Sequence, residues 1–189
     1  GEVLAAMCYD AGIEVTSLPG PAACITALTL SGLSTRRFAF EAFLPPDKKE
    51  RKAILEELKS ETRTIILYEA PHHLVGTLEE LYQVLGNRRM TLCRELTKKH
   101  ETAFRTTIQE LINFYKDQKP LGECVLVIEG RSRKEMEQES QESWKDISIE
   151  EHMAIYENQG IARKEAMKMV AKDRGVTKRD IYQALLELK

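Results

Sequence analysis

The feature that most constrains the fold is an alternation of short apolar runs with longer amphipathic segments between residues 13 and 129. An apolar run bounded by turn residues predicts a buried strand, and an apolar stripe with a period near 3.6 residues predicts a helix. This alternation favours an α/β fold, an open sheet with helices on both faces. We expect strands at 13–18, 37–44, 64–68, 90–93, 102–106 and 123–129, and helices at 22–30, 47–60, 71–85 and 107–115.

The chain opens inside a further helical pattern. Apolar residues from Val3 to Cys8 share one face, Gly12 follows as a C-cap, and no capping residue precedes Glu2. We therefore expect a chain trimmed at a loop of a longer protein.

The last part of the chain differs in composition. Residues 131–143 carry glutamates between other polar residues and no apolar anchors, which is typical of an acidic linker with some helix. Helical stretches follow at 149–158, 162–174 and 178–188, and Thr177 is the expected N-cap of the last one. This arrangement predicts a small helical domain.

Charge and cysteine usage exclude several classes of protein. The net charge of −2 gives no overall bias toward nucleic acid or membrane. No apolar run approaches the ~20 residues that a membrane helix needs, and we expect no membrane association. The cysteines and histidines lack metal-ligand spacing, so we expect a reduced, cytoplasmic protein without a metal site.

Chemistry is expected at three strand-to-helix junctions, because ligands of open α/β sheets collect beyond the strand ends. The first junction is residues 19–23, PGPAA. Its side chains are small and a helix starts there, so free backbone N–H groups could bind a ligand. A tight turn without a ligand explains the same residues. Glu69 ends a buried strand beside a helix start, which stabilises negative charge with or without a ligand. His72 and His73 are expected to be exposed. Residues 93–101 form either a solvated turn or a source of phosphate ligands and a base.

Five segments occur in a characteristic order: PGPAACITALTLSGL, FAFEAFLP, ILYEAPHHL, CRELTKKHE and GECVLVIEG. Together they resemble the tetrapyrrole (corrin/porphyrin) methylase superfamily, most closely its RNA-modifying branch. The tail at 163–182 resembles the small helical domain that closes this branch. The likeness therefore covers essentially the whole chain.

This resemblance implies two α/β lobes with S-adenosyl-L-methionine in the cleft between them, usually in a homodimer. The implied reaction methylates the ribose 2′-hydroxyl of a cytidine in small-subunit rRNA or the assembled small ribosomal subunit. The implied domains are a remnant of the N-terminal lobe at 1–36, the C-terminal α/β lobe at 37–131, an acidic linker at 132–147 and the helical domain at 148–189.

The resemblance also implies site residues. Matching the family's cofactor segments nominates Pro21, Ala22, Ala23, Tyr68, Glu69, Leu96 and Thr97. A base must accept the hydroxyl proton, and the candidates in order are Glu95, Lys98 (if Lys99 lowers its pKa) and Glu69. The candidate RNA-phosphate ligands are Arg94, Lys98, Lys99, Arg105, Lys178 and Arg179.

Two departures from the family pattern matter. The family's Gly- and Asp-rich cofactor loops, which precede the position of Gly1, are absent, so we expect this chain alone to bind cofactor weakly and to be inactive. His73 stands where the family commonly has arginine, and histidine replaces arginine only weakly as a phosphate ligand near neutral pH.

Two alternatives stay open. One is a methyltransferase of a tetrapyrrole or corrin precursor, against which the appended basic helical domain argues. The other is a helix-turn-helix nucleic-acid-binding protein with a non-catalytic α/β module, whose recognition helix would begin near Thr177.

Overall fold

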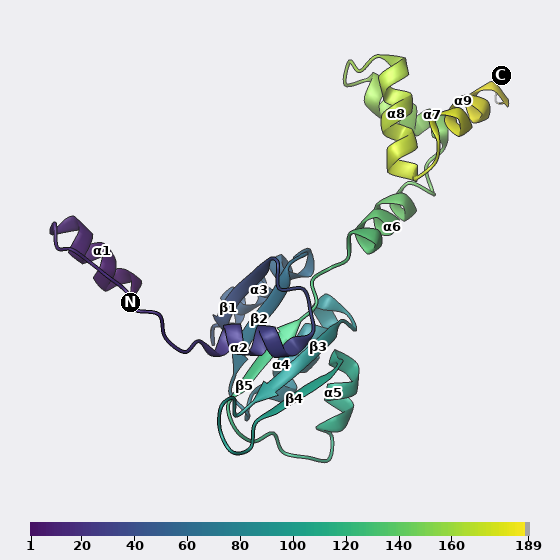
Figure 1. Cartoon of the computed structure of the whole chain (residues 1–189). Coiled ribbons are helices and arrows are strands. Elements are labelled where there is room, and N and C mark those ends of the chain that lie inside the picture. The colour runs from purple at the N-terminus through teal and green to yellow at the C-terminus, as the bar shows by residue number, and fades with distance from the viewer. Residues whose placement is uncertain (188–189) are drawn as a thin grey trace.

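A five-stranded sheet lies at the centre of the computed structural model, which describes residues 1–187 (Figure 1). The strand order is β1-β2-β5-β3-β4. β1 and β2 are parallel, whereas β5 runs antiparallel to β2 and β3, and β4 antiparallel to β3. The strands are β1 (Phe38–Phe43), β2 (Thr64–Glu69), β3 (Arg89–Arg94), β4 (Thr102–Thr107) and β5 (Cys124–Ile128).

Because β5 is antiparallel to its neighbours, carboxyl ends and amino ends of strands meet at the same end of the sheet. We call this end, where β2 and β3 finish and β5 starts, the mixed edge. The carboxyl ends of β1, β2 and β3 lie at the same edge as the amino ends of β4 and β5. The register shows this directly, because Cys124 at the start of β5 lies opposite both Glu69 and Arg94, the last residues of β2 and β3.

Helices cover both faces of the sheet, as predicted. One face packs against α3 (Lys48–Lys59), α4 (Leu74–Leu85) and α5 (Ile108–Phe114), and the other against α2 (Ala23–Ser31). Side chains of β2 alternate between the faces: Ile65 and Leu67 enter the first cluster, and Ile66 enters the second. Each such side chain contributes about 1.5–3 kcal/mol when fully buried. The two apolar layers fix the register of β2, since a one-residue slip would exchange them.

Local signals explain most helix boundaries. Asp47 caps α3 by accepting from the backbone N–H groups of Lys49 and Glu50, at 3.1 and 2.9 Å. Gly32 ends α2 with a φ of 72°. The helix expected from residue 71 begins at Leu74 instead, because residues 70–73 form a turn in which His73 donates to the Ala70 carbonyl.

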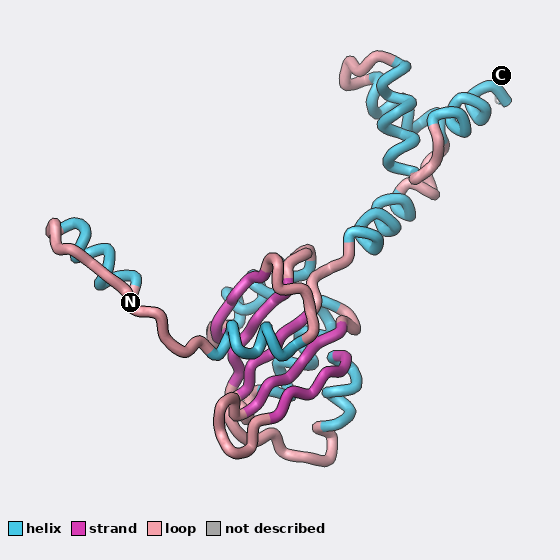
Figure 2. The backbone as a smooth tube through the Cα atoms, viewed as in Figure 1, coloured by secondary structure: helices cyan, strands magenta, loops and turns pink. Residues whose placement is uncertain are grey.

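The predicted strand at 13–18 is wrong. This segment follows helix α1 (Glu2–Asp10) as extended chain, and within the described residues it pairs with no strand (Figure 2). An alternating pattern forms a strand only where a neighbour accepts its backbone hydrogen bonds. It pairs with neither of the sheet's outer strands, β1 and β4, each of which has one strand neighbour.

The C-terminal part is helical. The expected linker contains a complete helix, α6 (Arg133–Ser143), which leads to α7 (Ile149–Glu157), α8 (Arg163–Arg174) and α9 (Lys178–Glu187). The last three pack around Met153, Ala166, Val170 and Ile181. Thr177 accepts from the backbone N–H of Asp180 at 3.3 Å, as an N-cap does. Leu188 and Lys189, which the sequence assigned to the last helix and domain, lie outside the described residues. No helix among residues 1–187 is long and apolar enough to cross a membrane.

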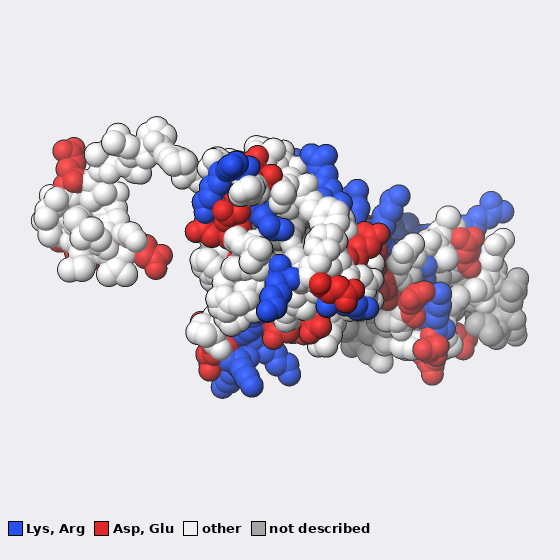
Figure 3. Space-filling model, turned by 90° about the horizontal axis from the view of Figure 1, so that it is seen from below, with Lys and Arg blue, Asp and Glu red and all other residues white. Residues whose placement is uncertain are grey.

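The N-terminal segment, residues 1–18, generates a prediction about self-association. α1 buries none of its residues, and Leu4, Met7 and Tyr9 are each about two-thirds exposed. Few charges interrupt this apolar surface (Figure 3). We expect the 189-residue chain to self-associate through this segment, and deletion of residues 1–18 to lower the mass seen by light scattering without lowering the unfolding midpoint. A clean monomer of the undeleted chain at high concentration would contradict this.

Candidate functional site

A cavity of about 420 Å³ opens at the mixed edge of the sheet, where β2 and β3 end and β5 begins. It brings together residues from all three predicted junctions, which are far apart in sequence. Of the seven predicted cofactor residues, Ala23, Tyr68, Glu69 and Leu96 line it. The other lining residues are Phe43, Ala70, Pro71, Glu123, Cys124 and Val125.

Tyr68 ties α2 to the sheet beside this cavity. Its hydroxyl accepts from the backbone N–H of Cys24 at 3.0 Å, and so satisfies one of the free donors at the start of α2. The ring packs edge-on against Phe40 and Phe43, at centroid distances of 5.0 and 5.6 Å. Burial raises the pKa of Tyr68, so the hydroxyl stays protonated at neutral pH. The first junction is therefore positioned by the second.

Glu69 is a buried carboxylate with defined partners. It is 7% exposed, and its Oε1 accepts from the backbone N–H of Ala70 at 2.8 Å. Its Oε2 accepts from the hydroxyl of Thr77 in α4 at 2.6 Å. Thr77 in turn accepts from Arg51 of α3 at 2.8 Å, and Arg51 pairs with Glu80 at 2.6 Å. Each Glu69 oxygen has one hydrogen-bond partner among the described residues, so each can accept a further hydrogen bond.

The loop after β3 is held by Glu95. The φ angles of Glu95 and Thr97 are 50° and 64°, a left-handed conformation that costs non-glycine residues free energy. The loop keeps it because Glu95 Oε1 accepts from the backbone N–H of Glu123 at 2.9 Å, while Glu95 N–H donates to the Glu123 carbonyl at 3.1 Å. Leu96 is thereby fixed in the wall of the cavity.

The first two candidate bases, Glu95 and Lys98, both have shifted pKa values. The Glu123 N–H holds the pKa of Glu95 below its ordinary value, so Glu95 is a weaker base than a free carboxylate. The hydrogen bond from Lys98 to Glu123, at 3.1 Å, raises the pKa of Lys98. The lowered pKa that a basic role for Lys98 requires is thus not present. Glu69 is the one of the three candidates that lines the cavity.

The candidate phosphate ligands near the loop have different surroundings. Arg94 donates to the Leu121 carbonyl at 2.9 Å, and Arg105 donates to the Leu30 carbonyl at 2.8 Å, where it caps α2. Lys99 is exposed. Lys178 and Arg179 lie at the start of α9 in the C-terminal helices, away from the sheet (Figure 1).

Pro21, Ala22 and Thr97 were predicted to contact the cofactor and do not line the cavity. Glu123 and Cys124 line it and were missed, because the expected sheet did not place the amino end of β5 at this edge. Burial raises the pKa of Cys124 to about 11, which keeps its thiol neutral. Thr77 and Arg51 were also missed, since nothing in the sequence shows that two helix positions support Glu69. No group of His, Cys, Asp and Glu among the described residues is arranged to hold a metal ion.

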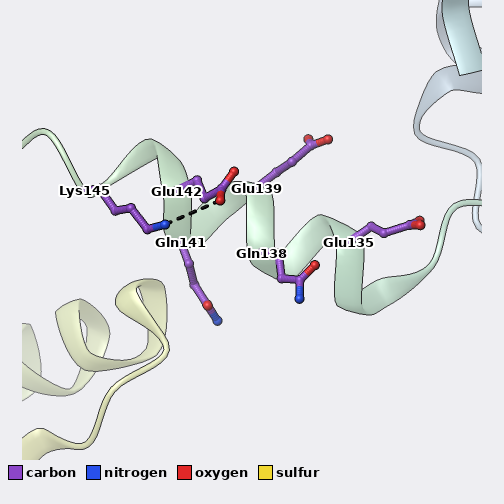
Figure 4. Close-up of a pocket in the computed structure, with 6 residues that line it drawn as sticks. All are labelled: Glu135, Gln138, Glu139, Gln141, Glu142 and Lys145. Carbon is purple, nitrogen blue, oxygen red and sulfur yellow. Dashed lines mark hydrogen bonds and ion pairs between the residues drawn. The ribbon is translucent and has the colours of Figure 1, made fainter. Parts of the chain in front are cut away.

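A larger hollow of about 480 Å³ lies along α6 (Figure 4). Its lining consists of Glu135, Gln138, Glu139, Gln141, Glu142 and Lys145. All of these belong to α6 or directly follow it, and the side chains point in different directions, with Lys145 and Glu142 paired at 3.4 Å. An open surface formed by one helix does not enclose a ligand.

Comparison with known proteins gives consistent results. The family described as Tetrapyrrole (Corrin/Porphyrin) Methylases matches residues 1–112. Proteins named ribosomal RNA small subunit methyltransferase I are 44% identical over 90% of this chain in Halalkalibacterium halodurans, 43% over 93% in Bacillus subtilis and 42% over 100% in Synechocystis. The matches cover 58%, 60% and 66% of those relatives, so the chain spans less than two thirds of their length.

Among solved structures, the methyltransferase CobJ is similar with a TM-score of 0.51 and 18% identity, over 68% of this chain and 56% of CobJ. At this identity the likeness shows a shared fold.

The packing of Glu95 against Gly122 generates a prediction about stability. Gly122 has a φ of 80°, and a Cβ placed there would lie 2.5 Å from Cγ of Glu95. We expect Gly122→Ala to lower the free energy of unfolding by about 1–3 kcal/mol, because it adds both backbone strain and a clash. The control is Gly76→Ala in α4, where a Cβ meets nothing within 4 Å, and which should stabilise by about 0.5–1 kcal/mol. Urea denaturation measures both, and equal effects of the two substitutions would show that Glu95 does not pack as described.

Proposed function

Because this chain belongs to the tetrapyrrole (corrin/porphyrin) methylase family, we propose that it forms part of an S-adenosyl-L-methionine-dependent methyltransferase. The proposed reaction transfers a methyl group to the ribose 2′-hydroxyl of a cytidine in small-subunit rRNA. The names of the relatives in Halalkalibacterium halodurans and Bacillus subtilis support an rRNA substrate. The relatives reported above carry the name of an rRNA methyltransferase and not of a tetrapyrrole-precursor methyltransferase.

The observation that carries this proposal is the cavity at the mixed edge of the sheet. Its volume of about 420 Å³ falls in the range of small-molecule sites, which is roughly 300–1,000 Å³. Its lining combines apolar and aromatic surface with the buried carboxylate of Glu69. This combination fits a cofactor that has an aromatic base, ribose hydroxyls and an amino group.

We assign the following roles to the chain's own residues. When bound, the cofactor supplies an electrophilic methyl group. Ala23 lets the ligand approach the start of α2, since it presents only a methyl side chain. Glu69 accepts hydrogen bonds from ligand hydroxyl or amino groups, and Leu96 helps to exclude water.

The proton acceptor is proposed on geometry and basicity together. Glu69 lines the cavity, whereas Glu95 accepts from the Glu123 N–H and Lys98 is paired with Glu123. We therefore place Glu69 first as the candidate acceptor. Glu95 and Lys98 then anchor the loop, and Arg94 and Lys99 remain candidate RNA ligands beside it.

The remaining proposals concern the whole protein. Residues 1–36 form a remnant of an N-terminal lobe, 37–131 the C-terminal lobe, 132–147 a linker and 148–189 a helical RNA-binding domain that includes Lys178 and Arg179. The protein acts as a cytoplasmic homodimer on rRNA or the small ribosomal subunit. The opposite wall of the cleft comes from the N-terminal lobe.

One prediction concerns cofactor binding. In the full-length protein, Glu69→Gln should weaken S-adenosylmethionine binding by about tenfold or more, because it removes a charged acceptor from a buried site. Glu79→Gln removes a charge from the exposed side of α4 and serves as the control. Isothermal titration calorimetry measures both, and equal affinities of the two variants would remove Glu69 from the cofactor site.

A second prediction concerns the product. Full-length protein with S-adenosylmethionine should convert one cytidine of unmodified small ribosomal subunits to 2′-O-methylcytidine, seen by mass spectrometry of nucleosides. Methylation of a tetrapyrrole precursor without rRNA modification would favour the second enzyme hypothesis. Tight binding of duplex DNA with no methyl transfer would favour the helix-turn-helix alternative.

A further inference from the structure

A second cavity of about 340 Å³ opens at the opposite edge of the sheet, where β1 and β2 begin and β5 ends. Its lining includes four arginines, Arg36, Arg37, Arg63 and Arg131, and one acidic residue, Glu129. We propose that this cavity binds phosphates of the RNA backbone. The inference rests on the proposed rRNA substrate and adds a binding site outside the cofactor cavity.

The chemistry of the lining favours phosphate. Guanidinium groups are planar forks that hold phosphate oxygens with two hydrogen bonds, and they stay charged at any physiological pH. Arg36 and Arg37 are both exposed, and among the side chains that the structure describes neither has a hydrogen-bond or ion-pair partner. The one acidic lining residue, Glu129, is itself paired with Arg89. Two charged forks are therefore available to an anion from solvent.

The cavity has a fixed frame, which distinguishes it from a group of surface arginines on a loose loop. The hydroxyl of Thr64 donates to the Ser34 carbonyl at 2.7 Å, and the Thr64 N–H donates to the Arg37 carbonyl at 3.3 Å. On the other side, the Arg131 N–H donates to the Glu61 carbonyl at 2.6 Å. Gly130 packs so closely on the Thr62 and Arg63 carbonyls that a Cβ there would clash. These contacts join the loop before β1 to the end of β5.

The other two arginines are held by acids of the chain. Arg63 forms a two-point contact with Glu61, at 3.0 and 2.5 Å. Arg131 pairs with Glu139 of α6, the acidic helix that leaves the sheet at this edge. Glu139 occupies the position that a phosphate on Arg131 would take, so the two compete for one guanidinium.

The position of the cavity suits a polyanion that reaches both functional regions. Along β2 the cofactor cavity lies about 17 Å away, at ~3.3 Å per strand residue. α6 begins beside Arg131 and leads toward the helices that carry Lys178 and Arg179 (Figure 1). RNA held here would lie between the proposed cofactor site and the C-terminal helices.

The test is a salt titration of binding between the full-length protein and a small-subunit rRNA transcript. Arg36→Ala combined with Arg37→Ala should weaken binding about five- to tenfold at moderate salt and lower the slope of log affinity against log salt by about 1.4–1.8. Arg36→Lys with Arg37→Lys keeps the charge but loses the planar guanidinium groups. Its RNA affinity should therefore lie between those of the unsubstituted protein and the double alanine variant. Glu139→Gln should strengthen binding, because it frees Arg131.

The charge control is Lys49→Ala with Lys52→Ala, which removes two exposed cations from α3. A slope unchanged by the arginine substitutions, or changed equally by the lysine control, overturns the proposal while leaving the proposed function intact. Absence of rRNA binding by the unsubstituted protein contradicts the proposed function, and this inference with it. Unchanged S-adenosylmethionine affinity in the arginine variant confirms that it is folded.

Discussion

The backbone pairing of β5 with both β2 and β3 is the interaction on which the rest of the structure depends. Every residue of β5 is buried, and its hydrogen bonds join two strands that are separated by α4 in the sequence. Because β5 is antiparallel to both neighbours, its amino end brings Glu123 and Cys124 to the proposed cofactor cavity. Its carboxyl end brings residues 129–132 to the arginine-lined cavity. The two candidate sites are thus the two ends of one buried strand.

Charged groups near the cofactor cavity have different environments and therefore suit different roles. Glu69 accepts from a backbone N–H and from the Thr77 hydroxyl, and it is one of the residues that line the cavity. Glu95 is also a carboxylate at a strand end, but its oxygen is used to hold a strained loop against Glu123. Two acids that look equivalent in the sequence thus separate into a residue that lines the cavity and one that anchors the loop.

Much of this arrangement could be predicted from local patterns. Asp47 and Thr177 mark helix starts through side-chain hydrogen bonds, and Gly32 marks a helix end because glycine adopts a left-handed backbone easily. The apolar run from Thr64 to Tyr68 marks a buried strand. The direction of β5 could not be predicted in this way, because strand pairing is set by contacts between distant segments. Glu123 was missed for that reason. The segment 13–18 shows the opposite failure, since its alternation is strand-like but it pairs with neither outer strand of the sheet.

The proposal that the cofactor binds at the mixed edge is tested most directly by a crystal structure of the full-length protein with S-adenosylhomocysteine. The ligand is expected against Ala23, Tyr68 and Leu96, with a hydroxyl or amino group donating to Glu69. A ligand bound elsewhere, with Glu69 still contacting only Ala70 and Thr77, would contradict the site.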